Sequence, residues 1–362
     1  MKITLIISTL SAGGAERNIV LLANFLSKKF DVNILTLQSK NSNIFYEINS
    51  NINVSSLNIL KKNNNFLDKF FNFFKRVLLI RKHLKKNKTE LFISFIDTTN
   101  ITVLISSLFL KSIKKRIISD RNNPYKVNNN LLTKCLKFIL YNYTSYLVLQ
   151  THEVKKAYWF INKKKIIVIS NFLTNQIKKK INYKFSNKLK IVAVGRLEDQ
   201  KGYDILIRAL SILKNKINFK CDIYGKGNKK KKIVNHILSK NLKNKIFLKG
   251  VRKKIGFILY KYDLYILSSR FEGYPNTLLE AMKIGMPIIS SDCEYGPKEI
   301  IKNNFNGILF RNQDYKDQAK KIFDLYTNKK KLLFIGKNAK KNSIIMNINK
   351  RNETKWLKII KK

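Results

Sequence analysis

The chain has 362 residues, enough for two domains of ordinary size, and carries 73 basic against 22 acidic residues, a formal net charge of +51. This balance indicates either a polyanionic partner (nucleic acid or an anionic membrane surface) or compositional drift, because lysine, asparagine and isoleucine are abundant together. Three widely spaced cysteines without metal-ligand spacing argue against a disulfide framework and favour a reducing compartment; they are Cys135, Cys221 and Cys293.

Short β-rich runs alternate with helical patterns from the start of the chain, which predicts parallel sheets with helices on both faces. The apolar run at residues 2–8 is too short for a signal peptide, so a first strand is expected there. No run reaches the roughly 18–20 apolar residues that a membrane span requires. The strands expected in the first half are Lys2–Ser8, Asp31–Leu37, Leu91–Phe95, Lys115–Ser119, Tyr146–Leu149 and Ile166–Ile169.

Polar residues follow these strands where each one ends. Because ligands bind beyond the carboxyl ends of the strands in open parallel sheets, these residues are expected to lie together at a ligand-binding edge. They are Gly13, Gly14, Glu16 and Arg17 after the first strand, Asp97 after the third, and Arg121 and Asn122 after the fourth.

Residues 66–86 mix phenylalanines with lysines and arginines at helical spacing. This pattern suits an amphipathic helix in a membrane interface, where each basic residue near an anionic leaflet contributes about 1 kcal/mol. An ordinary packing helix with a basic outer face explains the pattern equally well.

The second half repeats the alternation after a polar stretch at residues 176–187. Two doubly wound α/β domains are therefore predicted, at residues 1–175 and 188–344, and residues 345–362 hold a final helix with no strand after it. The expected strands are Lys190–Val194, Phe219–Ile223, Lys245–Leu248, Leu264–Leu267, Pro287–Ser290 and Gly307–Phe310.

Two cations follow the first strand of the second half. Arg196 stands directly after Gly195, and Lys201 lies five residues further on. Arginine can donate two parallel hydrogen bonds to a phosphate group, and lysine supplies a point charge. A nucleotide diphosphate is therefore the expected ligand. Gly225 and Val251 follow the next two strands, so they are expected at the same ligand-binding edge.

The segment Phe271–Met282 reads as an acidic loop and then a helix, with Pro275 in the helix's first turn. Glu272 and Glu280 can accept hydrogen bonds from hydroxyl groups. The free N–H groups of Asn276, Thr277 and Leu278 favour an anion. A ligand with polyol and phosphate ends, a nucleotide sugar, meets both requirements.

The string F-E-G-x-P-N-x-x-x-E-A-M resembles the EX7E signature of retaining family 4 glycosyltransferases, which have the GT-B fold: two Rossmann-like domains facing a cleft. G-R-x-x-x-Q-K-G from Gly195 resembles the family's diphosphate-binding element. The resemblance implies an N-terminal acceptor domain, a C-terminal nucleotide-sugar domain and a final helix that packs back on the first domain. It also implies that Glu272 binds sugar hydroxyls, that Glu280 binds ribose, and that configuration is retained. By the same resemblance, Gly14 contacts the donor, and the other polar residues that follow the first-half strands contact the sugar or the acceptor.

One departure concerns catalysis. Many relatives carry a histidine after the fourth strand, where this chain has Arg121; a subset shares this S-x-R-N string, and the catalytic base stays open. No Asp-x-Asp metal motif occurs. Metal-independent chemistry without a cofactor is therefore expected, with Arg196, Lys201 and the helix N-terminus stabilising the leaving diphosphate.

Residues 1–17 and 92–100 look most like bacterial enzymes that add N-acetylgalactosamine to undecaprenyl-diphosphate glycans. The resulting hypothesis is a UDP-sugar donor, a polyprenyl-diphosphate-linked or other envelope glycan acceptor, and a cytoplasmic protein on the anionic inner membrane surface. A basic nucleic-acid-binding protein is the rival reading, although no nucleic-acid motif is present and no specific nucleic acid is expected. An epimerase or phosphorylase on the same fold is a third.

Overall fold

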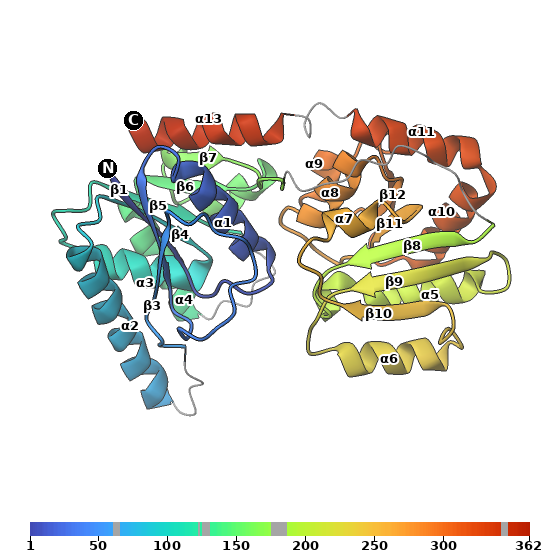
Figure 1. Ribbon diagram of the computed structural model, residues 1–362, viewed down its shortest axis with the longest axis horizontal. Helices are drawn as coiled ribbons and strands as arrows, with labels where there is room; N and C mark the ends of the chain where they lie inside the picture. Colours follow the sequence, from blue (N-terminus) through green and yellow to red (C-terminus); the bar gives the residue numbers. More distant parts are fainter. Residues whose placement is uncertain (61–65, 122–123, 125–130, 175–186, 342–346) are drawn as a thin grey trace. The chain divides into compact units, whose positions relative to one another are not determined.

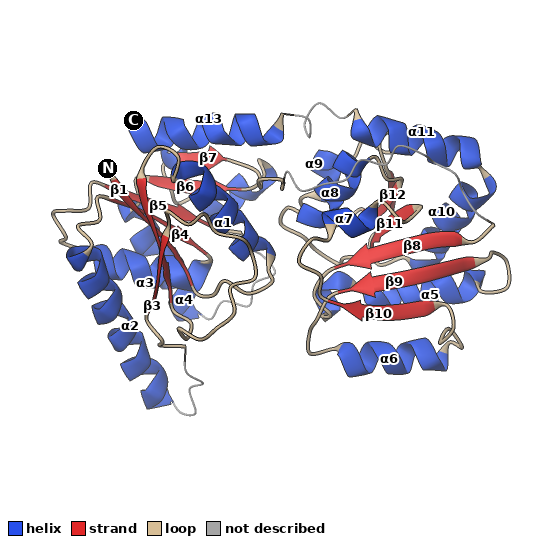
Figure 2. Cartoon of the chain, viewed as in Figure 1, coloured by secondary structure: helices blue, strands red, loops and turns tan. Residues whose placement is uncertain are grey.

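The computed structural model describes residues 1–60, 66–121, 124, 131–174, 187–341 and 347–362. The chain divides into two compact units, unit 1 with Met1–Phe172 and Lys350–Lys362, and unit 2 with Leu173–Asn349. The predicted limits at 175 and 188 lie beside this division. Each unit is an α/β layer structure built on a parallel sheet (Figure 2).

Unit 1 has a seven-stranded sheet in the order β3-β2-β1-β4-β5-β6-β7. Successive side chains of each strand point to opposite faces of the sheet. Alternate residues of β1, such as Ile3 and Leu5, therefore pack in the core on the face that α1 and α13 cover. Helices α2, α3 and α4 pack in sequence as a second layer (Figure 1). The elements are β1 Lys2–Ile7, α1 Gly14–Leu26, β2 Asp31–Thr36, β3 Asn53–Ser56, α2 Phe66–Lys86, β4 Leu91–Phe95, α3 Asp97–Ser107, β5 Lys115–Ser119, α4 Leu131–Leu140, η1 Tyr141–Tyr143, β6 Tyr146–Leu149, η2 Glu153–Tyr158, η3 Lys163–Lys165, β7 Ile166–Val168 and α13 Ile348–Lys361.

Unit 2 has a six-stranded sheet in the order β10-β9-β8-β11-β12-β13. Ile191 of β8 lies in the core beneath α5 and α10, while the next residue, Val192, lies in the core beneath α7 and α8. The elements are β8 Leu189–Val194, η4 Asp199–Lys201, α5 Tyr203–Leu213, β9 Phe219–Tyr224, α6 Lys230–Ser239, β10 Ile246–Gly250, α7 Gly256–Leu259, β11 Leu264–Leu267, α8 Asn276–Ile284, β12 Ile288–Ser291, α9 Pro297–Ile300, β13 Ile308–Phe310, α10 Tyr315–Thr327 and α11 Lys329–Lys340.

All twelve predicted strands are present within two residues of their expected limits, and both sheets are parallel as expected. The sequence did not indicate β3, whose residues Asn53–Ser56 are mostly polar and only partly buried. An edge strand pairs on one side only and needs no apolar run, so the hydrophobic pattern of the sequence does not reveal it.

The final helix, α13, belongs to unit 1 from Lys350 onward, and its first two residues, Ile348 and Asn349, belong to unit 2. Trp356 is fully buried in the core that also holds Ile360 and residues of α1. Asn352 fastens the helix further, because its Nδ2 donates to the backbone oxygens of Ser170 at 2.9 Å and Asn171 at 3.1 Å.

We expect Trp356→Ala to lower the free energy of unfolding of unit 1 by about 3–5 kcal/mol, because a large buried ring would leave a cavity. Urea unfolding followed by circular dichroism measures the change. Lys358→Ala, on the exposed side of the same helix, should stay within about 0.5 kcal/mol of wild type. Equal losses in the two variants would show that α13 is not part of the core.

Candidate functional site

Four neighbouring strands of unit 2 bring the predicted donor residues to one sheet edge. Strands β10, β9, β8 and β11 are adjacent and parallel, so their carboxyl ends lie together (Figure 1). Arg196 follows β8, Gly225 follows β9, Val251 follows β10, and Glu272 lies in the loop after β11. The prediction that these loops converge therefore holds within unit 2.

Glycine allows these loops to touch backbone to backbone. A Cβ at Gly225, where φ is +156°, would lie 1.8 Å from the carbonyl oxygen of Gly195. A Cβ at Gly202, where φ is +60°, would lie 2.0 Å from the carbonyl oxygen of Ser268. Only glycine fits such approaches, and the second one seats the turn after Lys201 on the end of β11.

Lys201 and Glu272 form an ion pair at this edge. Lys201 Nζ lies 2.6 Å from Glu272 Oε1, and the side chains are 16% and 6% exposed. Ser269 Oγ donates to the same oxygen at 2.6 Å, so the carboxylate has a fixed orientation. The sequence did not single out Ser269, which is one of many serines and is distinguished only by its place at the end of β11.

Arg196 is held more loosely than Lys201. Its Nη2 donates to Gln200 Oε1 at 3.0 Å, and Gln200 Nε2 donates to the backbone oxygen of Phe271 at 3.0 Å. The Arg196 side chain is 57% exposed. Its guanidinium therefore retains donors that face solvent on the same side of the sheet as Lys201.

Helix α8 begins one residue later than the sequence indicated. Pro275 is the residue before the helix, with ψ 103°, and Asn276 is the first helical residue. The Thr277 hydroxyl forms a 2.7 Å hydrogen bond with the Tyr265 hydroxyl of β11. Glu280 lies in the second turn of α8 and is fully buried, so its proposed contact with a ribose stays a prediction.

The glycine loop of unit 1 opens helix α1. Gly13 is the residue before the helix, and Tyr46 donates to its backbone oxygen at 3.0 Å. A Cβ at Gly13 would lie 2.0 Å from Glu16 Oε2, a flexible side-chain atom. Arg17 is buried, and this burial lowers the pKa of its guanidinium.

A buried charge cluster lies at the carboxyl edge of the seven-stranded sheet of unit 1 (sheet A). Lys137 Nζ of α4 lies 2.8 Å from Asp97 Oδ2 and 3.0 Å from Asp120 Oδ2, and all three side chains are less than 10% exposed. The hydroxyls of Tyr141 and Tyr158 also donate to Asp120. Asp97, predicted as a sugar or acceptor contact, is thus engaged with Lys137. Nothing in the sequence distinguished Lys137 from the other lysines.

Burial and charge act against each other in this cluster. Burial raises the pKa of Asp97 to about 6, the charge of Asp120 adds to this, and Lys137 opposes it. Burial would also raise the pKa of Asp120, but Lys137 and the tyrosine hydroxyl groups outweigh it and lower that pKa. Burial acts to lower the pKa of Lys137, yet the two carboxylates raise it overall.

Arg121 lies beside this cluster. Its guanidinium carbon is 4.2 Å from the ring centre of Phe95, and Nη1 donates to Asn171 Oδ1 at 2.7 Å. Asn122, predicted with it, lies outside the described residues. Ile96, between Phe95 and Asp97, has φ +78°. This is a rare conformation for a β-branched residue and marks strain at the same edge.

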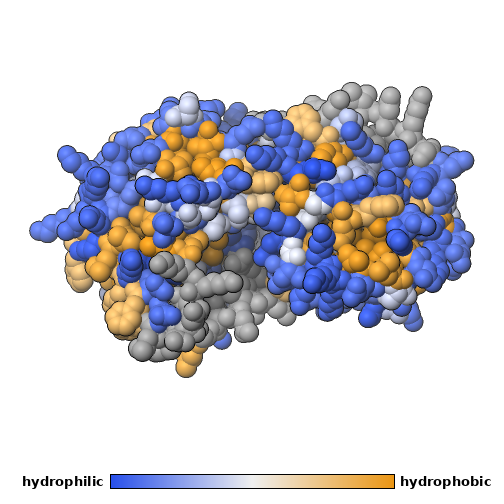
Figure 3. Space-filling view, turned by 60° about the horizontal axis from the view of Figure 1, so that its bottom comes forward, coloured by the Kyte–Doolittle hydropathy of each residue, from blue (hydrophilic) through white to orange (hydrophobic). Residues whose placement is uncertain are grey.

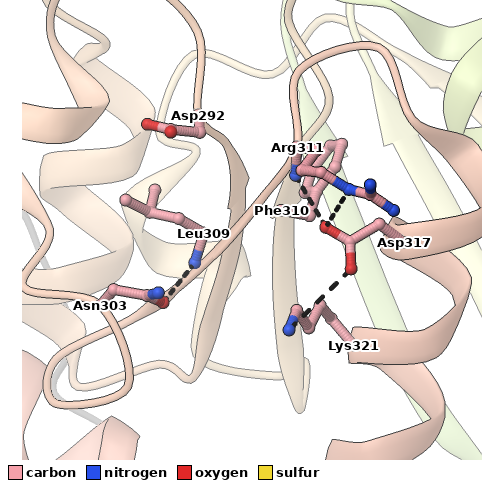
Figure 4. A pocket seen from close by; sticks show the side chains of 7 residues that line it. All are labelled: Asp292, Asn303, Leu309, Phe310, Arg311, Asp317 and Lys321. Atoms are coloured by element: carbon pink, nitrogen blue, oxygen red, sulfur yellow. Dashed lines mark hydrogen bonds and ion pairs between the residues drawn. The ribbon is translucent and has the colours of Figure 1, made fainter.

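The described residues also form an open pocket of about 400 Å³ beyond the ends of β12 and β13. Figure 4 shows that three of its charged residues contact one another, since Asp317 accepts from the backbone nitrogen of Arg311 at 2.8 Å and lies 3.9 Å from Lys321 Nζ. No predicted site residue lines this pocket. We therefore assign the candidate site to the converging loops.

Residues 174–342 match the family described as glycosyl transferases group 1. Over 99% of its length the chain is 29% identical to a Campylobacter jejuni enzyme named GalNAc-alpha-(1->4)-GalNAc-alpha-(1->3)-diNAcBac-PP-undecaprenol alpha-1,4-N-acetyl-D-galactosaminyltransferase, covering 98% of that protein. This similarity extends through both units.

Solved structures share the fold at low sequence identity. The chain matches Staphylococcus aureus TarM, solved with UDP, at a TM-score of 0.82 with 16% identity over 99% of each chain. It matches sucrose-phosphate synthase of Thermosynechococcus elongatus at 0.86 with 14% identity over 99% of this chain and 98% of that one. The predicted GT-B architecture, with two Rossmann-like α/β domains, is confirmed.

We expect Lys137→Met to destabilise unit 1 by about 3–5 kcal/mol at pH 8, because two buried carboxylates would lose their cation. Without the ammonium, burial would raise the pKa of both carboxylates above the unfolded value of about 4. The deficit is therefore fully present above the raised pKa and shrinks as the pH falls through it. Urea unfolding at pH 8 and pH 5 tests this dependence. Lys134→Met, an exposed position on the same helix, should show neither effect.

Proposed function

We propose that this chain, a glycosyltransferase that carries a glycosyl transferases group 1 domain over residues 174–342, transfers a hexose or N-acetylhexosamine from a UDP-sugar to a lipid-linked or cell-envelope glycan. The observation that carries the proposal is the Lys201–Glu272 ion pair with Arg196 at the same sheet edge. One carboxylate for hydroxyl groups and two cations for a diphosphate match the two ends of a nucleotide sugar.

The diphosphate would bind between Arg196, Lys201 and the N-terminus of α8. The backbone N–H groups of the first turn, at Asn276, Thr277 and Leu278, add the partial positive charge of a helix N-terminus. Charge that develops on the leaving diphosphate is then stabilised by donors that are already in place. We propose on this basis that the reaction requires no metal ion and no cofactor.

The sugar would bind at Glu272. Because Ser269 and Lys201 both contact Oε1, the carboxylate is oriented before a substrate arrives, and Oε2 can accept from sugar hydroxyls. Lys201 would contact Glu272 and the diphosphate at once, which links recognition of the sugar to recognition of the leaving group. Retention of configuration follows from the family resemblance, as does the assignment of Glu280 to the ribose.

The nucleotide would lie along the loops after β9 and β10. Gly225 lacks a side chain and its N–H donates to the backbone oxygen of Gly250 at 2.9 Å, which keeps the two loops together. Val251 follows directly and is partly exposed. The apolar side chain of Val251 next to the partly exposed backbone of Gly225 suits contact with a nucleobase.

The acceptor would bind unit 1 at the carboxyl edge of its sheet, where Gly13, Gly14, Glu16 and Arg17 follow β1. The Campylobacter jejuni relative is named for a glycan on undecaprenyl diphosphate. We propose a polyprenyl-diphosphate-linked glycan for this chain as well, which implies work at the cytoplasmic face of the inner membrane.

Helix α2 would dock the protein on that membrane. Phe70, Phe71, Phe74 and Leu78 are 48–69% exposed, and the lysines 75, 82, 85 and 86 between and beyond them are exposed as well. Figure 3 shows apolar surface set among hydrophilic surface on the molecule. No helix of the described chain is long and apolar enough to cross a bilayer. An anionic lipid surface complements this mixture of aromatic and basic side chains.

We expect Arg196→Ala to weaken UDP binding by roughly 10–100-fold, because it removes a charged hydrogen-bond donor worth about 1.5–3 kcal/mol. Glu272→Gln should abolish transfer while the protein stays folded. Calorimetry with UDP and transfer of labelled sugar from UDP-hexoses to a lipid extract measure the two effects. Arg208→Ala, an exposed arginine on α5, is the matched control.

The same assay tests the finer parts of the proposal. Transfer should continue unchanged in EDTA, and the product should have the anomeric configuration of the donor. Wild-type rates in both site variants would refute the site, and release of UDP without acceptor would favour an epimerase or phosphorylase.

We expect the protein to bind vesicles with 30% anionic lipid and not neutral vesicles. The double variant Phe71→Ser, Leu78→Ser should reduce binding by at least about tenfold, because two exposed apolar side chains of about 1.5–3 kcal/mol each are lost. Flotation measures it, and Phe334→Ser, an exposed phenylalanine of α11, is the control. Unchanged binding in the double variant would remove α2 as the docking helix.

A further inference from the structure

Arg121 is a buried cation at the carboxyl edge of sheet A. It is the second residue after β5, and only 8% of the residue is exposed. The guanidinium lies over the Phe95 ring, and Nη1 donates to Asn171 Oδ1, which also accepts from Gln150 Nε2 at 2.6 Å. These neutral partners fix the position of the guanidinium but do not neutralise its charge.

The carboxylate of the preceding residue, Asp120, accepts hydrogen bonds from groups other than Arg121. Asp120 Oδ1 accepts from Asn100 at 2.7 Å and from Tyr141 at 2.9 Å, and Oδ2 accepts from Lys137 and Tyr158. Among the described residues no carboxylate forms an ion pair with Arg121, and its Nε has no hydrogen-bond partner. Burial lowers the pKa of Arg121 to about 9, with Asp120 acting in the opposite direction.

Another arginine of the same strand shows the structural alternative. Arg116, at the other end of β5, donates from Nε to Ser107 Oγ at 3.3 Å and from Nη2 to the Ser107 backbone oxygen at 3.2 Å. Both bonds hold the strand to the end of α3, so Arg116 supports the fold. Within the described part of the chain, the guanidinium of Arg121 makes one hydrogen bond, from Nη1. Its Nε and Nη2 donors remain available, and these two donors together can bind an oxyanion in a bidentate way.

We propose that Arg121 binds a phosphate oxygen of a reactant at the carboxyl edge of sheet A, with Phe95 and Asn171 as its positioning residues. The inference rests on the proposed function, because that function supplies a diphosphate. A buried guanidinium without a counter-ion is costly, and an incoming phosphate would provide the missing negative charge. The diphosphate can come from the donor nucleotide or from the lipid-linked acceptor.

Removing the charge should separate stability from binding. In Arg121→Met we expect a melting temperature equal to or above wild type, because an unpaired buried charge is lost. We also expect at least tenfold weaker binding of one of two probes, UDP or farnesyl diphosphate. Loss of UDP binding assigns the donor phosphate, and loss of farnesyl diphosphate binding assigns the acceptor phosphate. Arg116→Met is the matched control and should lower the melting temperature without changing either affinity.

Asn171→Asp is an independent test, because it keeps both hydrogen bonds and places a carboxylate on Arg121. This internal counter-ion should raise the melting temperature and weaken binding of the same probe at least tenfold. Wild-type affinity for both probes in both variants would overturn the proposal, as would a fall in the melting temperature of Arg121→Met with unchanged binding. Failure of the wild-type protein to transfer sugar would instead refute the proposed function.

Discussion

Lys201 and Glu272 lie 71 residues apart in the chain, yet Nζ and Oε1 meet at 2.6 Å in a site that is largely shielded from solvent. A pair of opposite charges so little exposed requires both loops to be held firmly, since loss of either partner leaves a desolvated charge. The close approach of Gly202 to the end of β11 provides that restraint. Much of the second unit's edge, including the position of Arg196 through Gln200 and Phe271, depends on this junction.

The first unit also buries charged side chains, but as a cluster and not as a single ion pair. It buries two carboxylates and one ammonium around Asp120, and a guanidinium lies directly beside them. Lys137 pairs with both carboxylates, whereas Arg121 forms an ion pair with neither of them. Protonation of Asp97 would make the electrostatic potential at Arg121 more positive.

The two edges are chemically unlike. The edge of unit 2 combines exposed and half-buried cations with a helix N-terminus, which suits a ligand that arrives with several negative charges. The edge of unit 1 offers two buried arginines, Arg17 and Arg121, together with glycine backbone. This difference supports the proposal that the two units bind different reactants.

The sequence by itself determined the strands, the parallel sheets and the loops that carry Arg196, Lys201 and Glu272, because apolar runs and strand ends are local features. It did not reveal β3, whose short polar strand pairs at an edge. Only the tertiary structure decided that Lys201 and Ser269 both contact the carboxylate of Glu272. It also decided that Lys137 pairs with Asp97 and that Arg121 lacks a carboxylate partner among the described residues. These facts depend on which side chains meet across distant segments, and one lysine among so many basic residues carries no local sign of its partner.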